Sequence, residues 1–94
     1  MLIIAGSLQV GPDARDRYLA ECAPVIAQAR ATAGCLDFLL AADPLDPGRI
    51  HVYERWESPE QLEAFRGSGP SDAQTVAILD ADVHRYLISG VEAP

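Results

Sequence analysis

The sequence predicts an α+β fold built on one four-stranded antiparallel sheet, and three observations carry this prediction. Residues 50–56 alternate between β-branched or aromatic and polar side chains, which is the period of a strand with two unlike faces. Residues 18–29 place apolar side chains three and four positions apart, as an amphipathic helix does. The expected order of elements, β-α-β-β-α-α-β, matches the split βαβ pattern, in which the helices cover one face of the sheet in a ferredoxin-like arrangement.

The first half of the chain predicts a strand, a long helix and a second strand. Residues 2–10 are almost uniformly apolar, which is typical of a central strand covered on both faces. A Gly-Pro pair at 11–12 ends this strand and opens a helix, in which Pro24 is expected to cause a tolerated bend. Gly34 is the expected left-handed residue just past the end of this helix, and residues 35–42 form the second strand.

The strand at 50–56 is expected to pair with the second strand as a hairpin. The intervening residues 43–48 hold two prolines and a glycine, which forbid continued regular structure. Ser58 is the expected N-cap of a helix over residues 59–66. Gln61 stands three positions later, so the two side chains can satisfy each other's backbone N–H groups.

The last quarter of the chain predicts a further helix and a closing strand. Ser71 and Gln74 repeat the capping-box spacing before a helix of about two and a half turns. The candidate buried residues of this helix are Val76, Ile78 and Leu79. Residues 80–82 are expected to turn into a last strand over residues 83–89, and residues 91–94 to form a loose tail.

Length and composition limit the possible classes of protein. The 94 residues are enough for a single domain, residues 1–94, and too few for two independent cores. The formal net charge of -7 argues against a nucleic-acid backbone or an anionic membrane as partner, because both need a cationic face. No signal-peptide pattern and no membrane-length apolar run occurs, so a cytoplasmic location is expected. Cys22 and Cys35 lack CxxC spacing and are expected to be buried free thiols, with a bridge between the two as the alternative and no metal site.

One face of the predicted sheet lacks a cover. The helices protect one face only, and the apolar strands at 2–10 and 35–42 make the other face costly to leave in water. A second copy of the chain is the expected cover, so the sequence predicts a homodimer.

Residues 52–65, VYERWESPEQLEAF, resemble the antibiotic biosynthesis monooxygenase (ABM) domains of the dimeric α+β barrel superfamily. The resemblance lies in the Tyr-Glu-x-Trp strand ending, the capped helix directly after it, and the Gly-Cys start of the strand at 35–42. It implies homodimers whose sheets face each other, and oxygenation of phenolic polyketides, quinols or haem without a flavin or a dedicated metal cofactor. Many such domains carry a His where this chain has Phe65, which argues against haem degradation because Phe cannot ligate iron.

An oxygenase without a cofactor must deprotonate an electron-rich substrate, hold the resulting anion and exclude water. The candidate catalytic residues are Glu54, His51 and His84 as proton acceptors, and Trp56 as an aromatic wall. The candidate substrate-binding residues are Tyr18, Tyr53, Leu62, Phe65 and Tyr86. If the helices cover the face that bears Trp56, Glu54 lies in the same layer, whereas His51 and Tyr53 face solvent or the partner copy.

Each candidate also has an ordinary structural interpretation. Trp56 can be a core anchor, and Glu54 can pair with an arginine at an interface. The histidines and tyrosines can be ordinary strand and packing residues.

Three classes of function remain open from the sequence. The first is a small cofactor-independent monooxygenase that acts on an aromatic, polyketide- or quinol-like compound with O₂. The second is a non-catalytic dimeric module that binds a small apolar ligand or serves as an accessory subunit. The third is a related barrel isomerase or cyclase that does not use O₂, and fold similarity alone does not choose between them.

Overall fold

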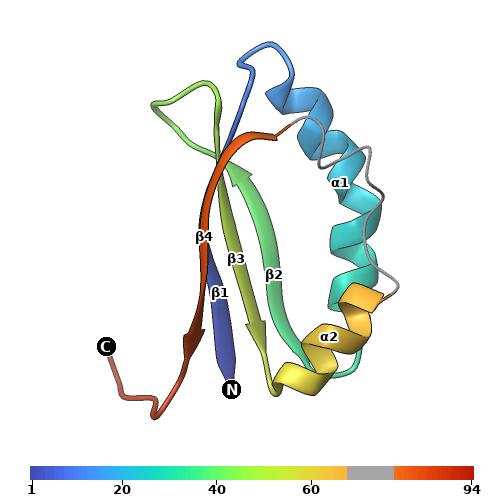
Figure 1. The fold of residues 1–94 in the computed structure, drawn as a ribbon, viewed down its shortest axis with the longest axis vertical. Coiled ribbons are helices and arrows are strands. Elements are labelled where there is room, and N and C mark those ends of the chain that lie inside the picture. The colour runs from blue at the N-terminus through green and yellow to red at the C-terminus, as the bar shows by residue number, and fades with distance from the viewer. Residues whose placement is uncertain (68–77) are drawn as a thin grey trace.

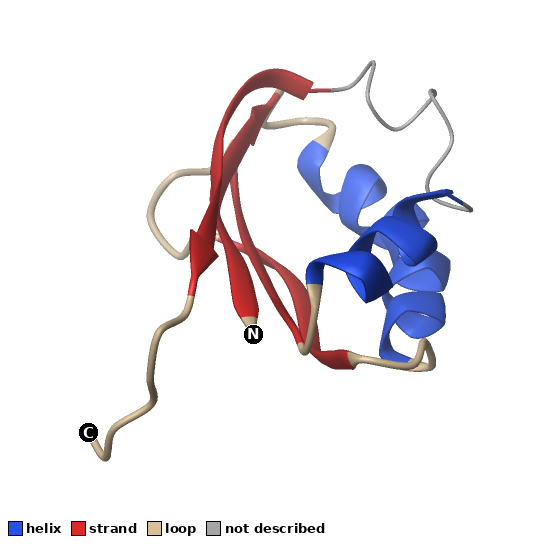
Figure 2. Cartoon of the chain, turned by 60° about the horizontal axis from the view of Figure 1, so that its bottom comes forward, coloured by secondary structure: helices blue, strands red, loops and turns tan. Residues whose placement is uncertain are grey.

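The computed structural model describes residues 1–67 and 78–94. Within these ranges the elements are β1 (Leu2–Val10), α1 (Arg15–Arg30), β2 (Cys35–Ala42), β3 (Arg49–Trp56), α2 (Pro59–Gly67) and β4 (Ile78–Leu87). Figure 1 shows the strands as one curved sheet with α1 and α2 on the same side. The turned view in Figure 2 shows the same two layers, with the C-terminal tail extending away from both.

The sheet has the strand order β2-β3-β1-β4, and each neighbouring pair is antiparallel. β1 is therefore a central strand, as its apolar sequence predicts, and β2 and β3 form the expected hairpin. Leu2 of β1 lies opposite Trp56 of β3 on one side and Leu87 of β4 on the other. This topology confirms the predicted α+β, ferredoxin-like fold.

The strand pleat divides the side chains of β3 between two environments. Ile50, Val52, Glu54 and Trp56 face the helices and are buried, whereas His51, Tyr53 and Arg55 point to the opposite side of the sheet.

The helix-facing layer holds two core clusters. One cluster joins both helices to the sheet and consists of Leu2, Ile4, Ala29, Phe38, Trp56, Leu62 and Phe65. The other lies against the first half of α1 and consists of Val10, Tyr18, Cys22 and Ile50.

We call the sheet surface opposite the helices the outer face. One row across it runs from Leu39 of β2 through Tyr53 of β3 and Ala5 of β1 to His84 of β4. Leu39 remains 43% exposed, and Tyr86 in the neighbouring row remains 51% exposed. In the described ranges no helix covers this face, so large apolar and aromatic side chains of the isolated chain meet solvent there.

The prediction for the start of the last strand was wrong. β4 begins at Ile78, so Ile78 and Leu79 belong to a strand and not to a helix, and residues 80–82 continue the strand instead of turning. Asp80 lies opposite Gln9 and Asp82 opposite Ser7, which places both carboxylates on the outer face, in water. The acidic residues that suggested a turn are therefore the polar half of a strand alternation. The rest of the predicted helix, residues 71–77, lies outside the described residues.

Both ends of α1 also differ from the prediction. The helix begins at Arg15, because residues 12–14 form a turn in which the Ala14 N–H donates to the Gly11 carbonyl. It ends at Arg30, where the Ala31 N–H still bonds back into the last turn. Gly34 does have a left-handed φ of 89°, but it serves the entry to β2. Helix α1 continues through Pro24.

Gly34 also allows α2 to approach the sheet. A Cβ at this position would lie 2.2 Å from Cδ of Gln61, in the first turn of α2. Gln61 is held there by one half of the predicted cap, because its N–H donates to Ser58 Oγ at 3.3 Å. Contrary to the prediction, the Gln61 side chain does not accept from the Ser58 backbone N–H but from the Ser58 hydroxyl, at 3.0 Å. Both bonds fix the strand-to-helix corner after Trp56, and the sequence predicts the first of them.

No helix in the described ranges is long and apolar enough to cross a membrane. The last strand ends at Leu87, two residues before the predicted end at residue 89, and residues 88–94 form no helix or strand.

Candidate functional site

A cavity of about 300 Å³ lies between the helix-facing side of the sheet and α1. It separates the two core clusters, since Ile4 and Phe38 border it from one cluster and Tyr18 and Cys22 from the other. Its remaining apolar lining is Leu8, Val25, Leu40, Val52, Ala81 and Val83. The volume is at the lower end of the range of small-molecule pockets, about 300–1,000 Å³, which suits one compact ring system.

Glu54 is the buried carboxyl of this cavity. It lies in the middle of the sheet on β3, and only 9% of the residue is exposed. Burial raises the pKa of Glu54, while the hydrogen bond from Trp56 and the positive charge of Arg66 act in the opposite direction. A desolvated carboxylate of this kind is a stronger base than an exposed one, and its protonated form is a usable acid. Glu54 is therefore a buried acid, and within the described residues it forms no ion pair with an arginine.

Trp56 holds the Glu54 carboxyl in place. The two residues are two positions apart on β3 and so face the same layer, and the Trp56 indole N–H donates to Glu54 Oε1 at 3.0 Å. Trp56 is fully buried, with its ring centroid 5.5 Å from that of Phe65 and the Phe65 ring 5.8 Å from Phe38. This aromatic packing fixes the indole, and the indole fixes one carboxyl oxygen.

Tyr18 and Cys22 border the cavity from α1, one helical turn apart. Burial, together with the neighbouring Cys22, raises the pKa of Tyr18 to about 12. Burial also raises the pKa of the Cys22 thiol, although a hydrogen bond with Tyr18 opposes this shift. At neutral pH the cavity therefore presents a neutral phenol and a neutral thiol on its helix wall, and neither is an activated nucleophile.

Arg66 brings a positive charge to the cavity from the last turn of α2. Its position is fixed by the buried residues of the same helix, Leu62 and Phe65, which anchor α2 on the core. Arg66 itself is exposed, so the guanidinium lies where the cavity meets solvent.

The predicted site residues fall into three groups. Glu54 and Tyr18 border the cavity. Trp56, Leu62 and Phe65 are buried in the core cluster beside it and do not line it.

The third group lies on the outer face, away from the cavity, and consists of His51, Tyr53, His84 and Tyr86. The two histidines are bound to carboxylates there. His51 Nε2 lies 2.5 Å from Asp43 Oδ1, and His84 Nε2 lies 2.7 Å from Asp82 Oδ1. The structure therefore brings Glu54, and neither histidine, to the cavity.

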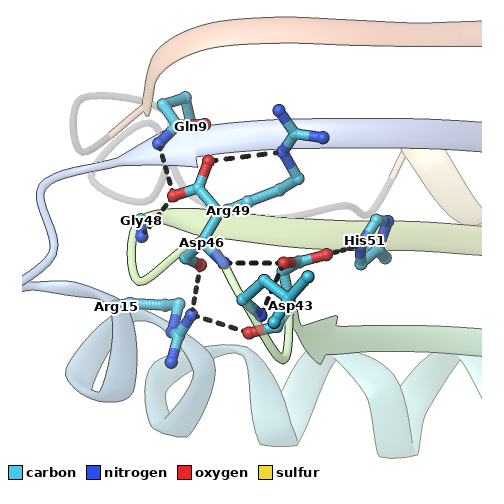
Figure 3. A network of polar contacts seen from close by, with 8 residues as sticks. Gln9, Arg15, Asp43, Asp46, Gly48, Arg49 and His51 are labelled. Atoms are coloured by element: carbon cyan, nitrogen blue, oxygen red, sulfur yellow. Dashed lines mark hydrogen bonds and ion pairs between the residues drawn. The ribbon is translucent and has the colours of Figure 1, made fainter.

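The His51 contact belongs to a network that orders the β2–β3 loop (Figure 3). Hydrogen bonds from His51 and from the backbone N–H groups of Asp46 and Leu45 hold the pKa of Asp43 well below its usual range. Arg15 donates from the start of α1 to the Asp46 carbonyl at 2.8 Å and to the Asp43 carbonyl at 3.3 Å. Every partner in the network is an internal group of the loop or its neighbours, which is the arrangement of a structural loop.

Sequence reasoning missed two polar residues of the cavity. Arg66 is not among the predicted site residues, and Cys22 is predicted only as a buried free thiol. The helical spacing of Tyr18 and Cys22 was a usable signal, because residues four apart share a helix face. No sequence signal placed Arg66, because its approach to Glu54 depends on how α2 packs on the sheet.

The site offers acid–base groups in a mainly apolar pocket. In the described part of the chain, no three His, Cys, Asp or Glu side chains are grouped to hold a metal ion. Both cysteines are free, Cys22 buried and Cys35 only partly buried, which corrects the expectation that both are buried. The arrangement can move a proton at Glu54 and donate a hydrogen bond from Tyr18 to a bound ligand.

The topology and the cavity place this chain among ferredoxin-like α+β domains that enclose a pocket between one sheet face and its helices. The model of the family described as antibiotic biosynthesis monooxygenase matches residues 1–74. The chain belongs to this family, which confirms the resemblance seen in residues 52–65.

Solved structures share the fold over nearly the whole chain. A candidate antibiotic biosynthesis monooxygenase from Deinococcus radiodurans aligns with a TM-score of 0.86 and 19% identity, over 100% of this chain and 98% of that one. Another from Chloroflexus aurantiacus has a TM-score of 0.75 and 26% identity, and the alignment covers 98% of this chain and 96% of that one. A Mycobacterium tuberculosis protein has a TM-score of 0.75 and 26% identity, over 99% and 97%. No curated protein matches the sequence significantly.

Proposed function

We propose that this protein is a cofactor-independent monooxygenase that oxygenates an aromatic, polyketide- or quinol-like compound with O₂. The strongest support is the environment of the Glu54 carboxyl. It is buried in a mainly apolar cavity, and its Oε1 accepts a hydrogen bond from the Trp56 indole N–H at 3.0 Å. Membership of the antibiotic biosynthesis monooxygenase family supports the reaction class.

In the proposed reaction Glu54 removes a proton from an activated methylene or phenol of the substrate. The electron-rich anion then reduces O₂, and a carbon–oxygen bond forms to give a hydroperoxide. Loss of water leaves a carbonyl, so one oxygen atom enters the product and the other leaves in water with two substrate hydrogens. Tyr18 supports this step, because a phenol whose pKa is about 12 keeps its proton and can donate to the anion.

The proposal includes a homodimer whose sheets meet through their outer faces. Two observations support it: Leu39 and Tyr86 are exposed there, and Arg55 Nε is buried without a hydrogen-bond partner in the described residues. A partner sheet would cover the apolar groups and could supply an acceptor. We also propose a cytoplasmic location, which the two free cysteines support.

Oxygen uptake tests the proposed function. Metal-stripped protein is incubated with a panel of anthrone-type phenols and reduced naphthoquinols, and heat-denatured protein measures spontaneous autoxidation. We expect saturable uptake above this control, reduced about 10²–10⁴-fold in Glu54→Gln. Glu57→Gln is the matched control, because Glu57 is exposed just beyond the same strand. Turnover of a panel compound without oxygen uptake would instead indicate an isomerase or cyclase, and no turnover would favour a binding module.

A further inference from the structure

Arg66 differs from most arginines of this chain because no acceptor for it lies within residues 1–67 and 78–94. Arg17, Arg49 and Arg85 form ion pairs with neighbouring carboxylates. Arg15 and Arg30 donate to backbone carbonyls. In the described residues the Arg66 guanidinium has neither kind of partner, although it borders the cavity.

Arg66 and Glu54 act on each other across the cavity without touching. The charge of Arg66 influences Glu54, yet no ion pair within 4.0 Å joins the two side chains in the described structure. Both border the same cavity, whose other walls are mainly apolar. The cavity thus has a cationic group at its solvent side, an apolar body, and a carboxyl fixed at its sheet wall.

We propose that the ligand of this cavity is a compact aromatic anion, with an ionised oxygen at Arg66 and a hydroxyl or acidic C–H group at Glu54. An arginine fork binds a carboxylate through two parallel hydrogen bonds, and an apolar ring fills the space between the two polar groups. The inference rests on the proposed function in taking the cavity as the substrate site. It adds which end of the substrate carries charge and in which direction the molecule enters.

A matched pair of probes tests this directly. The first probe is a hydroxynaphthoate whose hydroxyl and carboxylate lie at opposite ends of the ring system, and the second is the corresponding neutral hydroxynaphthamide. Dissociation constants are measured by titration calorimetry for the full chain and for Arg66→Met. The control is Arg17→Met, which removes the same charge from a side chain that is 82% exposed and paired with Glu21 on α1.

We expect the unaltered protein to bind the carboxylate about tenfold more tightly than the carboxamide, a ratio typical of one partly exposed charge-assisted contact. Arg66→Met should bring the ratio close to one, and Arg17→Met should leave it unchanged. The preference should also weaken as salt is added, because the guanidinium is accessible to ions.

Three results would overturn the inference. They are equal or tighter binding of the carboxamide, a preference that survives Arg66→Met, and the absence of binding of either probe at millimolar concentration. Failure of the proposed function is a separate outcome. Absence of oxygen uptake with the charge preference intact would refute the monooxygenase and keep the ligand class. Uptake with the neutral phenols of the panel, together with no preference for the carboxylate probe, would refute the ligand class alone.

Discussion

The proposed chemistry depends on one residue pair, Glu54 and Trp56. Their spacing on a strand puts them in one layer, and the packing of Trp56 against Phe65 determines where the indole N–H points. Burial raises the pKa of Glu54, and a shifted pKa makes the free energy of unfolding depend on pH. The effect of Glu54 can therefore be measured both in activity and in stability.

Glu54→Gln should change how stability depends on pH. Burial raises the pKa of Glu54 in the folded state above its unfolded value, so the folded state binds the proton more tightly. The stability that Glu54 contributes is therefore fully present below the unfolded pKa of about 4.3, and it is lost as pH rises through the folded pKa. Gln stays neutral and can still accept from Trp56. Urea unfolding from pH 4.5 to 8 should show a smaller decline for the variant than for the unaltered chain, and parallel curves would contradict the buried-acid description.

Trp56→Phe should shift the pH dependence of activity. The indole N–H stabilises the ionised form of Glu54, so removing it should raise the pKa of this carboxyl further. The acid limb of the kcat/KM profile should then move to higher pH, because the base is protonated over a wider range. Loss of rate with an unmoved acid limb would mean that Trp56 acts only through packing. A thermal melt of the variant would confirm that it is folded at the assay temperature.

The sequence predicts which site residues lie together when they belong to the same element, and it does not when they come from different elements. The alternation of β3 places Glu54 with Trp56 and separates both from His51 before any coordinates are known. Arg66 required the packing of α2 on the sheet, which no local pattern encodes. The two histidines look equally suited to proton transfer in the sequence, and only the choice of covered face removes them from the cavity.

At the scale of elements, the corner between β3 and α2 controls the site. Trp56 is the last residue of β3, and Arg66 lies in the last turn of α2, so the angle of this corner sets how Arg66 approaches the cavity. The capping pair Ser58 and Gln61 fixes the first turn of α2.

Ser58→Ala should reduce the free energy of unfolding by about 1 kcal/mol, because the Gln61 N–H loses its acceptor. Ser58→Asp should restore most of this loss, since a carboxylate also accepts at an N-cap and suits the helix dipole. Urea denaturation of the two variants measures both effects. Equal destabilisation by Ala and Asp would show that the cap does not stabilise α2.

Element boundaries were less predictable than element types. The strand character of residues 78–82 was hidden by two acidic residues, which suggest a turn until their pairing with Ser7 and Gln9 is known. The predicted end of α1 was wrong for a similar reason. Gly34 does have a left-handed backbone, but it lies at the start of β2 and not at the end of the helix. Periodicity was sufficient for the four strands and the two described helices, because burial on one face depends on it.

At the scale of the molecule, the outer face is the side of the sheet that no helix of the described residues covers. Leu39 is 43% exposed in the isolated chain and lies in a row with Tyr53. A partner copy that buries this face would complete the two-sheet assembly that the sequence predicts.

Leu39→Glu should convert the proposed dimer to monomer by placing a charge in the apolar interface. Leu45→Glu is the matched control, because Leu45 is 92% exposed in the β2–β3 loop. Light scattering at micromolar concentration should give a dimer mass for the unaltered chain and for Leu45→Glu, and a lower mass for Leu39→Glu. A monodisperse, folded monomer for the unaltered chain would contradict the two-sheet assembly.

The most direct test of the central claim is the fate of isotopically labelled O₂. A dihydroxyanthrone is incubated with metal-stripped protein under ¹⁸O₂, and the quinone product is analysed by mass spectrometry against heat-denatured protein and Glu54→Gln. We predict one heavy oxygen at the new carbonyl, formed at a rate well above both controls. Product formed no faster than with Glu54→Gln, or with its new oxygen taken from water, would contradict a Glu54-dependent monooxygenase.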